Sequence, residues 1–254
     1  MKNITQKTLC VLFSILFIIP FSFVFGCSTN DPMYYFNTSV TVAVTDKALT
    51  EQVKNQIKSF LSETESTLSV TDKNSDVYRI NSAEAGYPVA ASETTANLFG
   101  LCKDYYERTG GKFNAGSLPL SKLWGLSADT YNKVIIKEEP TDEKIAETKA
   151  LCEDFEGNFI YNDGFITKTQ TGSALDFGGI AKGYSVDGIK NILSANGYKK
   201  GYINIGGSSL YILSVDENLS VKHPRKKGEY IISVSNDIIN GAPISTSRSE
   251  EHTS

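Results

Sequence analysis

The residues with the clearest chemical potential form the run LDFGGIAKGY, residues 175–184, which leads into a predicted helix. Glycines at the start of a helix let a ligand approach the backbone closely, and the unpaired amides there favour an anion. Lys182 would add positive charge, and Asp176 could hold a ribityl or ribose hydroxyl or join a magnesium shell. The run predicts a site for the diphosphate of a nucleotide. The alternative is a tight strand-to-helix turn, because the run is neither a P-loop nor a GxGxxG fingerprint.

Two other segments carry groups that could meet a ligand. In GGKFNAGSLPLSKLWGL, residues 110–126, Phe113 offers an aromatic face and Asn114 a two-sided amide. Trp124 is interpreted as a core or lid residue rather than a stacking partner. In the segment 204–207, two glycines either bring the backbone near a ligand or form a bend.

Composition limits the function classes. The chain has 254 residues, a net charge of −4, 40% hydrophobic and 21% charged residues, which excludes a disordered chain and allows a substantial core. The weak acidic balance argues against nucleic acid as a partner. With only two histidines, His223 and His252, a His-rich zinc site or Ser-His-Asp hydrolysis has no support.

The N-terminal segment predicts export. Lys2 and Lys7 precede an apolar run at 9–25 that ends at VFGC, which resembles a bacterial lipobox. We expect residues 1–26 to be a lipoprotein signal peptide, Cys27 to be lipidated and 27–33 to be a tether. That places the protein on the extracytoplasmic face of the cell membrane, periplasmic or cell-surface. The alternative is an uncleaved membrane anchor.

Hydrophobic periodicity predicts the elements that would position these groups. We expect a strand at 34–45, a helix at 49–68, a loop at 69–88 and a helix from Ser92 to the Gly110-Gly111 stop. A helix from Thr141 would include Cys152.

Downstream, strands would flank the turn at 162–164, followed by a helix from about 179 to Gly197. The buried face of that helix is predicted to carry Ile180, Tyr184, Ile189 and Leu193. Strands at 201–215 and 229–237 complete the pattern. Without regular strand–helix alternation, the fold class is α+β. Cys102 and Cys152 are interpreted as small core residues, with a disulfide between them as the alternative.

In their order and spacing, these segments resemble the FAD:protein FMN transferase family, the ApbE-like flavin transferases. The specific part is LDFGGIAKGY followed by INIGG. FNTSVTV, LSVTDKNSDVYRIN, GGKFNAGSLPLSKLWG and ISTS support it. The resemblance covers residues 34–247, which we expect to form one flavin transferase domain with mixed and antiparallel sheets and packed helices.

The resemblance implies an enzyme that binds FAD and a divalent metal, Mg²⁺, and moves FMN to a Thr or Ser hydroxyl of an acceptor flavoprotein, releasing AMP. It places the metal on the carbonyl of Gly179 and gives Asp176 the catalytic role. The implied FAD contacts are Phe36, Thr71, Lys112, Phe113, Asn114, Asp176, Lys182 and Ile244. The alternatives are a tethered FAD-binding lipoprotein without transfer activity, and an FAD diphosphatase.

The chain departs from the family pattern at several positions. The family commonly has Met-Gly-Thr at 36–38, Tyr at Thr71 and Asp at Asn114. Family members also continue beyond Ser247 with residues that complete the metal shell. We interpret 248–254, RSEEHTS, as a non-native tail and expect the domain to be incomplete at its C-terminus, with weak or no activity for this chain.

Overall fold

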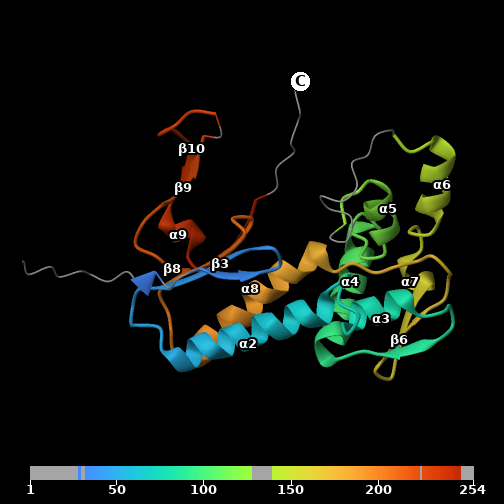
Figure 1. The fold of residues 1–254 in the computed structure, drawn as a ribbon. Coiled ribbons are helices and arrows are strands. Elements are labelled where there is room, and N and C mark those ends of the chain that lie inside the picture. The colour runs from blue at the N-terminus through green and yellow to red at the C-terminus, as the bar shows by residue number, and fades with distance from the viewer. Residues whose placement is uncertain (1–27, 30–31, 128–138, 224, 247–254) are drawn as a thin grey trace, which may run out of the picture.

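The computed structural model describes residues 28–29, 32–127, 139–223 and 225–246 (Figure 1). The predicted signal peptide, Cys27 and the predicted tail at 248–254 lie outside these ranges. Within them, no helix combines the length and the apolar character needed to cross a bilayer.

One half of the molecule, here called the sheet lobe, is built on a six-stranded antiparallel sheet in the order β1-β3-β7-β8-β11, with β2 paired to β3. Its strands are β1 (Ser28–Thr29), β2 (Met33–Tyr35), β3 (Thr38–Val44), β7 (Gly201–Ile205), β8 (Ser209–Ser214) and β11 (Pro243–Ser245). A small ribbon of β9 (Leu219–Lys222) and β10 (Tyr230–Val234) and the helix α9 (Asn236–Ile239) extend from β8.

The single strand predicted at 34–45 is in fact a hairpin. β2 and β3 pair in register around Phe36 and Asn37, whose φ angles are 54° and 56°. Two successive positive φ angles match the twist of a two-residue hairpin, so the chain reverses where the sequence shows only a run of β-formers. Asn tolerates this conformation, whereas Phe rarely adopts it.

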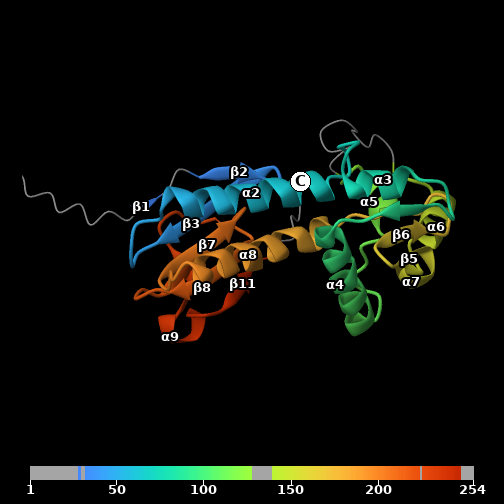
Figure 2. The same cartoon turned by 90° about the horizontal axis from the view of Figure 1, so that it is seen from below.

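Two long helices lie side by side along the molecule, α2 (Glu51–Leu68) and α8 (Gly178–Ala195) (Figure 2). Their approach is close because Gly188 leaves room for Phe60: a Cβ at 188 would lie 2.1 Å from the Phe60 Cζ. α2 begins at the Thr50 cap, whose side chain accepts the Val53 amide hydrogen. Both helices bury apolar side chains against the sheet, including Ile57, Leu61, Ile189 and Leu193.

The other half, here called the helical lobe, packs one long helix and several short ones around a three-stranded antiparallel sheet in the order β4-β6-β5. Its elements are α3 (Asp76–Ser82), β4 (Pro88–Ala90), α4 (Glu93–Thr109), α5 (Leu118–Leu123), α6 (Asp142–Ala150), α7 (Phe155–Asn158), β5 (Phe159–Asn162) and β6 (Phe165–Lys168). Figures 1 and 2 show this lobe at the far end of α2 from the sheet lobe. The largest buried side chains of its core include Phe155, Phe177, Leu98 and Ile80.

The α+β class is confirmed, and so are the helices at 51–68, 93–109 and 178–195. The loop predicted at 69–88 is wrong in part, because α3 forms there with Ser75 accepting the Tyr78 amide hydrogen as its cap. Cys152 lies just beyond α6 instead of inside it.

On α8, the buried positions differ slightly from the prediction. Ile189 and Leu193 are buried as expected, but Ile180 and Tyr184 are only half-buried, and Ala181 and Val186 are buried instead. Cys102 and Cys152 are both free and buried, as the core interpretation requires.

Candidate functional site

The start of α8 is organised by Asp176. The Asp176 amide donates to the carbonyl of Ala115 at 2.8 Å, and its Oδ1 accepts the Gly178 amide hydrogen at 2.7 Å. The sequence predicts unpaired amides at this helix start. The Gly178 amide is instead paired with the Asp176 carboxylate. Asp176 lies one residue before the N-cap residue Phe177, and its carboxylate pairs the first amide of the exposed Gly178-Gly179 backbone.

Asn81 of α3 fixes the residue before Asp176. Its Oδ1 accepts the Leu175 amide hydrogen at 2.7 Å, and its Nδ2 donates to the Leu175 carbonyl at 2.8 Å. Lys168 in turn donates from Nζ to the Asn81 carbonyl at 2.7 Å. This chain of contacts, here called the Asn81 clamp, ties α3 and β6 to the start of α8.

A cavity of about 310 Å³ lies on one side of the helix start and is called the helix-start cavity. Phe36, Thr71 and Asp176 line it, together with Glu65 and Gly178. Glu65 Oε1 accepts the Phe36 amide hydrogen at 2.6 Å, which holds this residue at its positive φ. A bulky residue in that conformation stores strain, which is typical of ligand sites.

A second cavity, of about 470 Å³, lies on the other side of the helix start and is called the sheet-side cavity. Phe113, Gly179, Lys182 and Ile244 line it. A Cβ at 179 would lie 3.3 Å from the Phe113 Cε2, so glycine lets the aromatic ring rest against the first turn of α8. Tyr105 of α4 supports that ring edge-on, with 5.9 Å between ring centroids.

The helix-start cavity thus contains three of the implied FAD contacts. The sheet-side cavity contains three others and the implied metal contact, Gly179. Gly178 and Gly179 are adjacent in the chain, so the two cavities flank the same turn of helix. Lys112 and Asn114 line neither cavity. Asn114 has a structural task, since its Nδ2 donates to the Cys152 carbonyl at 2.5 Å and its Oδ1 accepts the Gly116 amide hydrogen at 2.7 Å.

Sequence reasoning missed Glu65 and Tyr105, each of which orients a predicted contact. Glu65 lies on α2 and Tyr105 on α4, both outside any motif. The sequence around these two residues does not indicate a role in the site, because only tertiary packing brings α2 and α4 to the start of α8. The described ranges contain no cluster of three or more His, Cys, Asp or Glu side chains that could hold a metal.

Asp76, at the start of α3, is a buried carboxylate held by several hydrogen bonds. Burial alone would raise its pKa, but hydrogen bonds outweigh that effect and the pKa lies below its usual value. Its Oδ2 accepts the Ser92 amide hydrogen at 2.7 Å and the Thr95 hydroxyl at 2.8 Å, and Oδ1 pairs with Arg79. Asp76 thereby joins the first turns of α3 and α4.

Comparison with known proteins places this geometry in context. The ApbE family model matches residues 36–253. A FAD:protein FMN transferase of Klebsiella pneumoniae (strain 342) is 29% identical over 163 residues, which is 64% of this chain and 48% of that protein. One from Vibrio cholerae serotype O1 is 26% identical over 207 residues, 74% of this chain and 59% of that protein. The chain spans about half the length of the curated relatives it matches.

Solved structures show the same fold. A flavin transferase ApbE structure from Vibrio cholerae superposes with a TM-score of 0.69 at 20% identity, over 80% of this chain and 66% of that one. The ApbE protein of Thermotoga maritima gives a TM-score of 0.67 at 23% identity, over 85% of this chain and 74% of that one. The antiparallel sheets with packed helices are therefore the fold of these proteins.

Proposed function

This chain belongs to the ApbE family, and from that premise we propose that it acts as a FAD:protein FMN transferase. The FMN moiety of FAD would pass to a Thr or Ser hydroxyl of an acceptor flavoprotein, and AMP would leave. The names of the curated relatives support this reaction class.

One observation carries the proposal: two cavities with the implied FAD contacts flank a single exposed helix start. Phe36, Thr71 and Asp176 on one side and Phe113 and Lys182 on the other would bind one elongated ligand across the Gly178-Gly179 backbone. A diphosphate at that point would meet the positive end of the α8 dipole. The aromatic side chains on either side suit the rings of a flavin dinucleotide.

The residues around the start of α8 are suited to binding Mg²⁺. Glu65 and Asp176 both line the helix-start cavity, and two carboxylates would repel a bare diphosphate. Asp176 and the Gly179 carbonyl offer the oxygen donors that a hard cation prefers. When bound, the ion would neutralise charge that builds on the leaving AMP.

The chain's own residues would bind and orient the reactants, which is the main requirement of phosphoryl transfer. The acceptor oxygen would form a bond to the FMN phosphorus as the bond to AMP breaks. Asp176 would receive or direct the hydroxyl proton, since its carboxylate lines the cavity and is held in place through Gly178. Lys182 would place positive charge beside the diphosphate.

The test is to incubate the protein with FAD, Mg²⁺ and an acceptor domain that carries the target Thr, followed by intact-mass analysis of the acceptor. Covalent FMN on the acceptor and free AMP are the products that the proposal expects, and the weak activity predicted from the sequence would appear as a small flavinylated fraction. Bound but intact FAD would instead favour a flavin-binding lipoprotein, and free FMN with AMP would favour an FAD diphosphatase. An acceptor with the target Thr changed to Val is the matched control.

We also propose that Cys27 carries a lipid that anchors the protein at the extracytoplasmic face of the membrane. The support is the basic start, the apolar run and the VFGC sequence. The Cys27→Ala variant should lose metabolically incorporated alkyne-palmitate and retain the uncleaved signal segment, which intact-mass analysis would detect. If Cys27→Ala still incorporates the label, this cysteine is not the anchor.

A further inference from the structure

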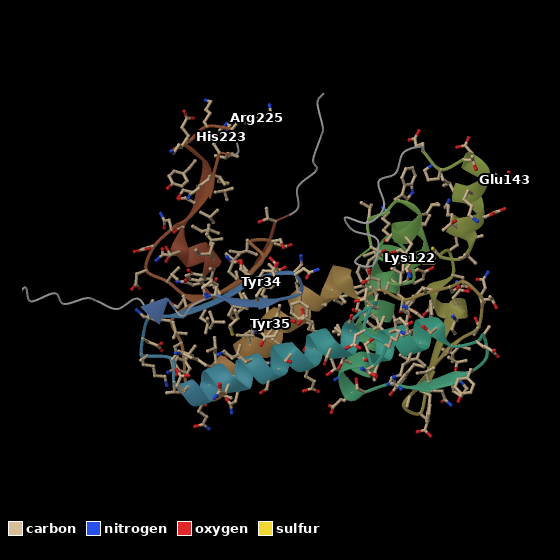
Figure 3. All side chains as sticks on the ribbon, in the orientation of Figure 1. Tyr34, Tyr35, Lys122, Glu143, His223 and Arg225 are labelled. Atoms are coloured by element: carbon tan, nitrogen blue, oxygen red, sulfur yellow. The ribbon has the colours of Figure 1, made fainter. Side chains whose placement is uncertain are left out.

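A third cavity, of about 970 Å³, lies in the helical lobe and is called the lysine cavity. Its lining includes three lysines, Lys122, Lys144 and Lys168. Among the residues that the structure describes, no Asp or Glu lines it. It borders the helix-start cavity at Val70 and Thr71. In Figure 3, Lys122 lies on α5 in the helical lobe, whereas Glu143 extends from the outer end of α6. Lys144 is paired with Glu147 at 3.1 Å, so the charge that distinguishes this cavity beside the proposed flavin site is that of Lys168.

Lys168 is the unusual member of this set because it is buried. It shares the inward face of β6 with Ile166, and only 6% of it is exposed. Within the described ranges, the one hydrogen bond of its ammonium goes to the Asn81 carbonyl, and no carboxylate there forms an ion pair with it. Burial lowers its pKa, as expected for a cation removed from water. A buried charge without a countercharge is costly, which points to a partner that the protein alone does not supply.

We propose that the lysine cavity binds the phosphate group of a small molecule, with Lys168 as the buried countercharge. The hydroxyls of Tyr78 and Ser82 line the same cavity and have no hydrogen-bond partner among the described residues. The lysine ammonium and the rotatable hydroxyls can donate hydrogen bonds to the several acceptor oxygens of a phosphate. No arginine, whose planar guanidinium would favour a carboxylate, is among the described residues that line the cavity. This site adjoins the helix-start cavity at Val70 and Thr71 but uses different charged groups, so the proposal stands whether or not the protein transfers FMN.

The site can be located without any substitution. In a titration of the isotope-labelled protein with inorganic phosphate at constant ionic strength, the amides of Asn81 and Ser173 should shift in a saturable way. The amide of Tyr198, in the sheet lobe, should not. Shifts at Gly178 and Gly179 without shifts at Asn81 and Ser173 would place the anion at the flavin site and overturn the proposal. Shifts that do not saturate would also overturn it.

A substitution then tests the countercharge. Lys168→Met keeps the length of the side chain and removes its charge, so the dissociation constant for inorganic phosphate should rise at least tenfold. Lys149→Met is the matched control, because Lys149 is an exposed lysine on α6 paired with Glu153 at 3.5 Å. It should bind phosphate within twofold of the unmodified protein. A folded Lys168→Met protein with unchanged affinity would mean that Lys168 only caps the last turn of α3, and the proposal fails. If Lys168→Met does not fold, the titration of the unmodified protein decides.

The phosphate group could be free or part of a nucleotide, and AMP distinguishes the two sources. If AMP displaces inorganic phosphate and shifts the same amides, the site takes a nucleotide phosphate. If phosphate remains bound in excess AMP, the site takes inorganic phosphate. Both outcomes retain the proposed site, while AMP binding that leaves Asn81 and Ser173 unperturbed assigns the nucleotide elsewhere.

Discussion

Asp176 combines a structural task with a proposed chemical one, and two substitutions separate them. Asp176→Asn retains an oxygen that can accept the Gly178 amide hydrogen, whereas Asp176→Ala removes this acceptor. We expect the Ala variant to lose about 1 kcal/mol of unfolding free energy and the Asn variant less than half of that. FMN transfer should fall about 10²-fold or more in both, because neither has a carboxylate. Urea unfolding and acceptor flavinylation measure the two effects, and full turnover by Asp176→Ala would remove this residue from the site.

Asp76 should make the stability of the helical lobe depend on acid. Its pKa is lowered in the folded state, so its contribution is complete above the unfolded value near pH 4 and is lost as the pH falls through the folded value. Asp76→Asn should cost about 1–3 kcal/mol at pH 7, since the hydrogen bonds to Ser92 and Thr95 lose their charged acceptor. Urea unfolding at pH 7 and pH 3 measures this effect. The difference in unfolding free energy between the unmodified protein and Asp76→Asn should be smaller at pH 3 than at pH 7. An equal difference at both pH values would contradict it.

At the level of single residues, the sequence predicted several side chains that the structure places together, but not all of their local contacts. Asp176, Phe113 and Lys182 were predicted from glycine-rich runs and family resemblance, and the structure places them around one helix start. Glycine spacing is visible in sequence because it reflects backbone conformation. Asn114 shows the limit, since the same amide that could bind a ligand instead bonds the loop around Cys152. Whether these side chains bind FAD stays a prediction.

Among the elements, the connection between α3 and α8 has the clearest consequence for the site. The Asn81 clamp supplies both a donor and an acceptor to the backbone of Leu175. Asn81→Ala should cost about 2 kcal/mol or more, because it leaves a buried amide and carbonyl unpaired. It should also weaken FAD binding by releasing the segment that carries Asp176.

Asn81→Asp is the matched control for the clamp. It retains the acceptor for the Leu175 amide but places a negatively charged oxygen against the Leu175 carbonyl in place of the donor, so a stability loss as large as that of Asn81→Ala would show that this donor is required. Thermal unfolding and a fluorescence titration with FAD measure stability and binding. FAD affinity equal to that of the unmodified protein in a folded Asn81→Ala variant would show that the clamp does not position the site.

Long periodic helices were predictable, while short elements were not. α2 has apolar residues at helical spacing over 18 positions, which fixes its type from sequence. α3 is only seven residues long and lies in a polar, turn-rich stretch, and its position depends on contacts of Asp76 and Asn81 with distant segments. The hairpin at Phe36-Asn37 was missed for a related reason: an aromatic residue at positive φ contradicts local preference and is held by Glu65 from α2.

At the scale of the whole molecule, α2 and α8 contribute to both hydrophobic cores. Leu68 and Ala181 belong to the core of the helical lobe, while Leu61 and Ile189 belong to that of the sheet lobe. Neither lobe can lose its packing without exposing part of a helix that the other requires. We therefore expect the two lobes to unfold in a single cooperative transition.

The single tryptophan of the chain provides a local probe of this cooperativity. Trp124 ends α5 in the helical lobe, whereas far-UV circular dichroism reports on both lobes. The two signals should give the same midpoint in urea. A lower midpoint for Trp124 fluorescence would show that the helical lobe opens by itself and that the shared helices do not couple the cores.

Because the start of α8 lies between the lobes, a ligand bound there would stabilise their contact. The walls around it come from the β2–β3 turn and α2 on one side and from α4, β8 and β11 on the other. A molecule filling both cavities would resist separation of all these segments at once. At a concentration one hundred times its dissociation constant, it would add about 2.7 kcal/mol against global opening. Protease cleavage should then slow even in loops far from the ligand.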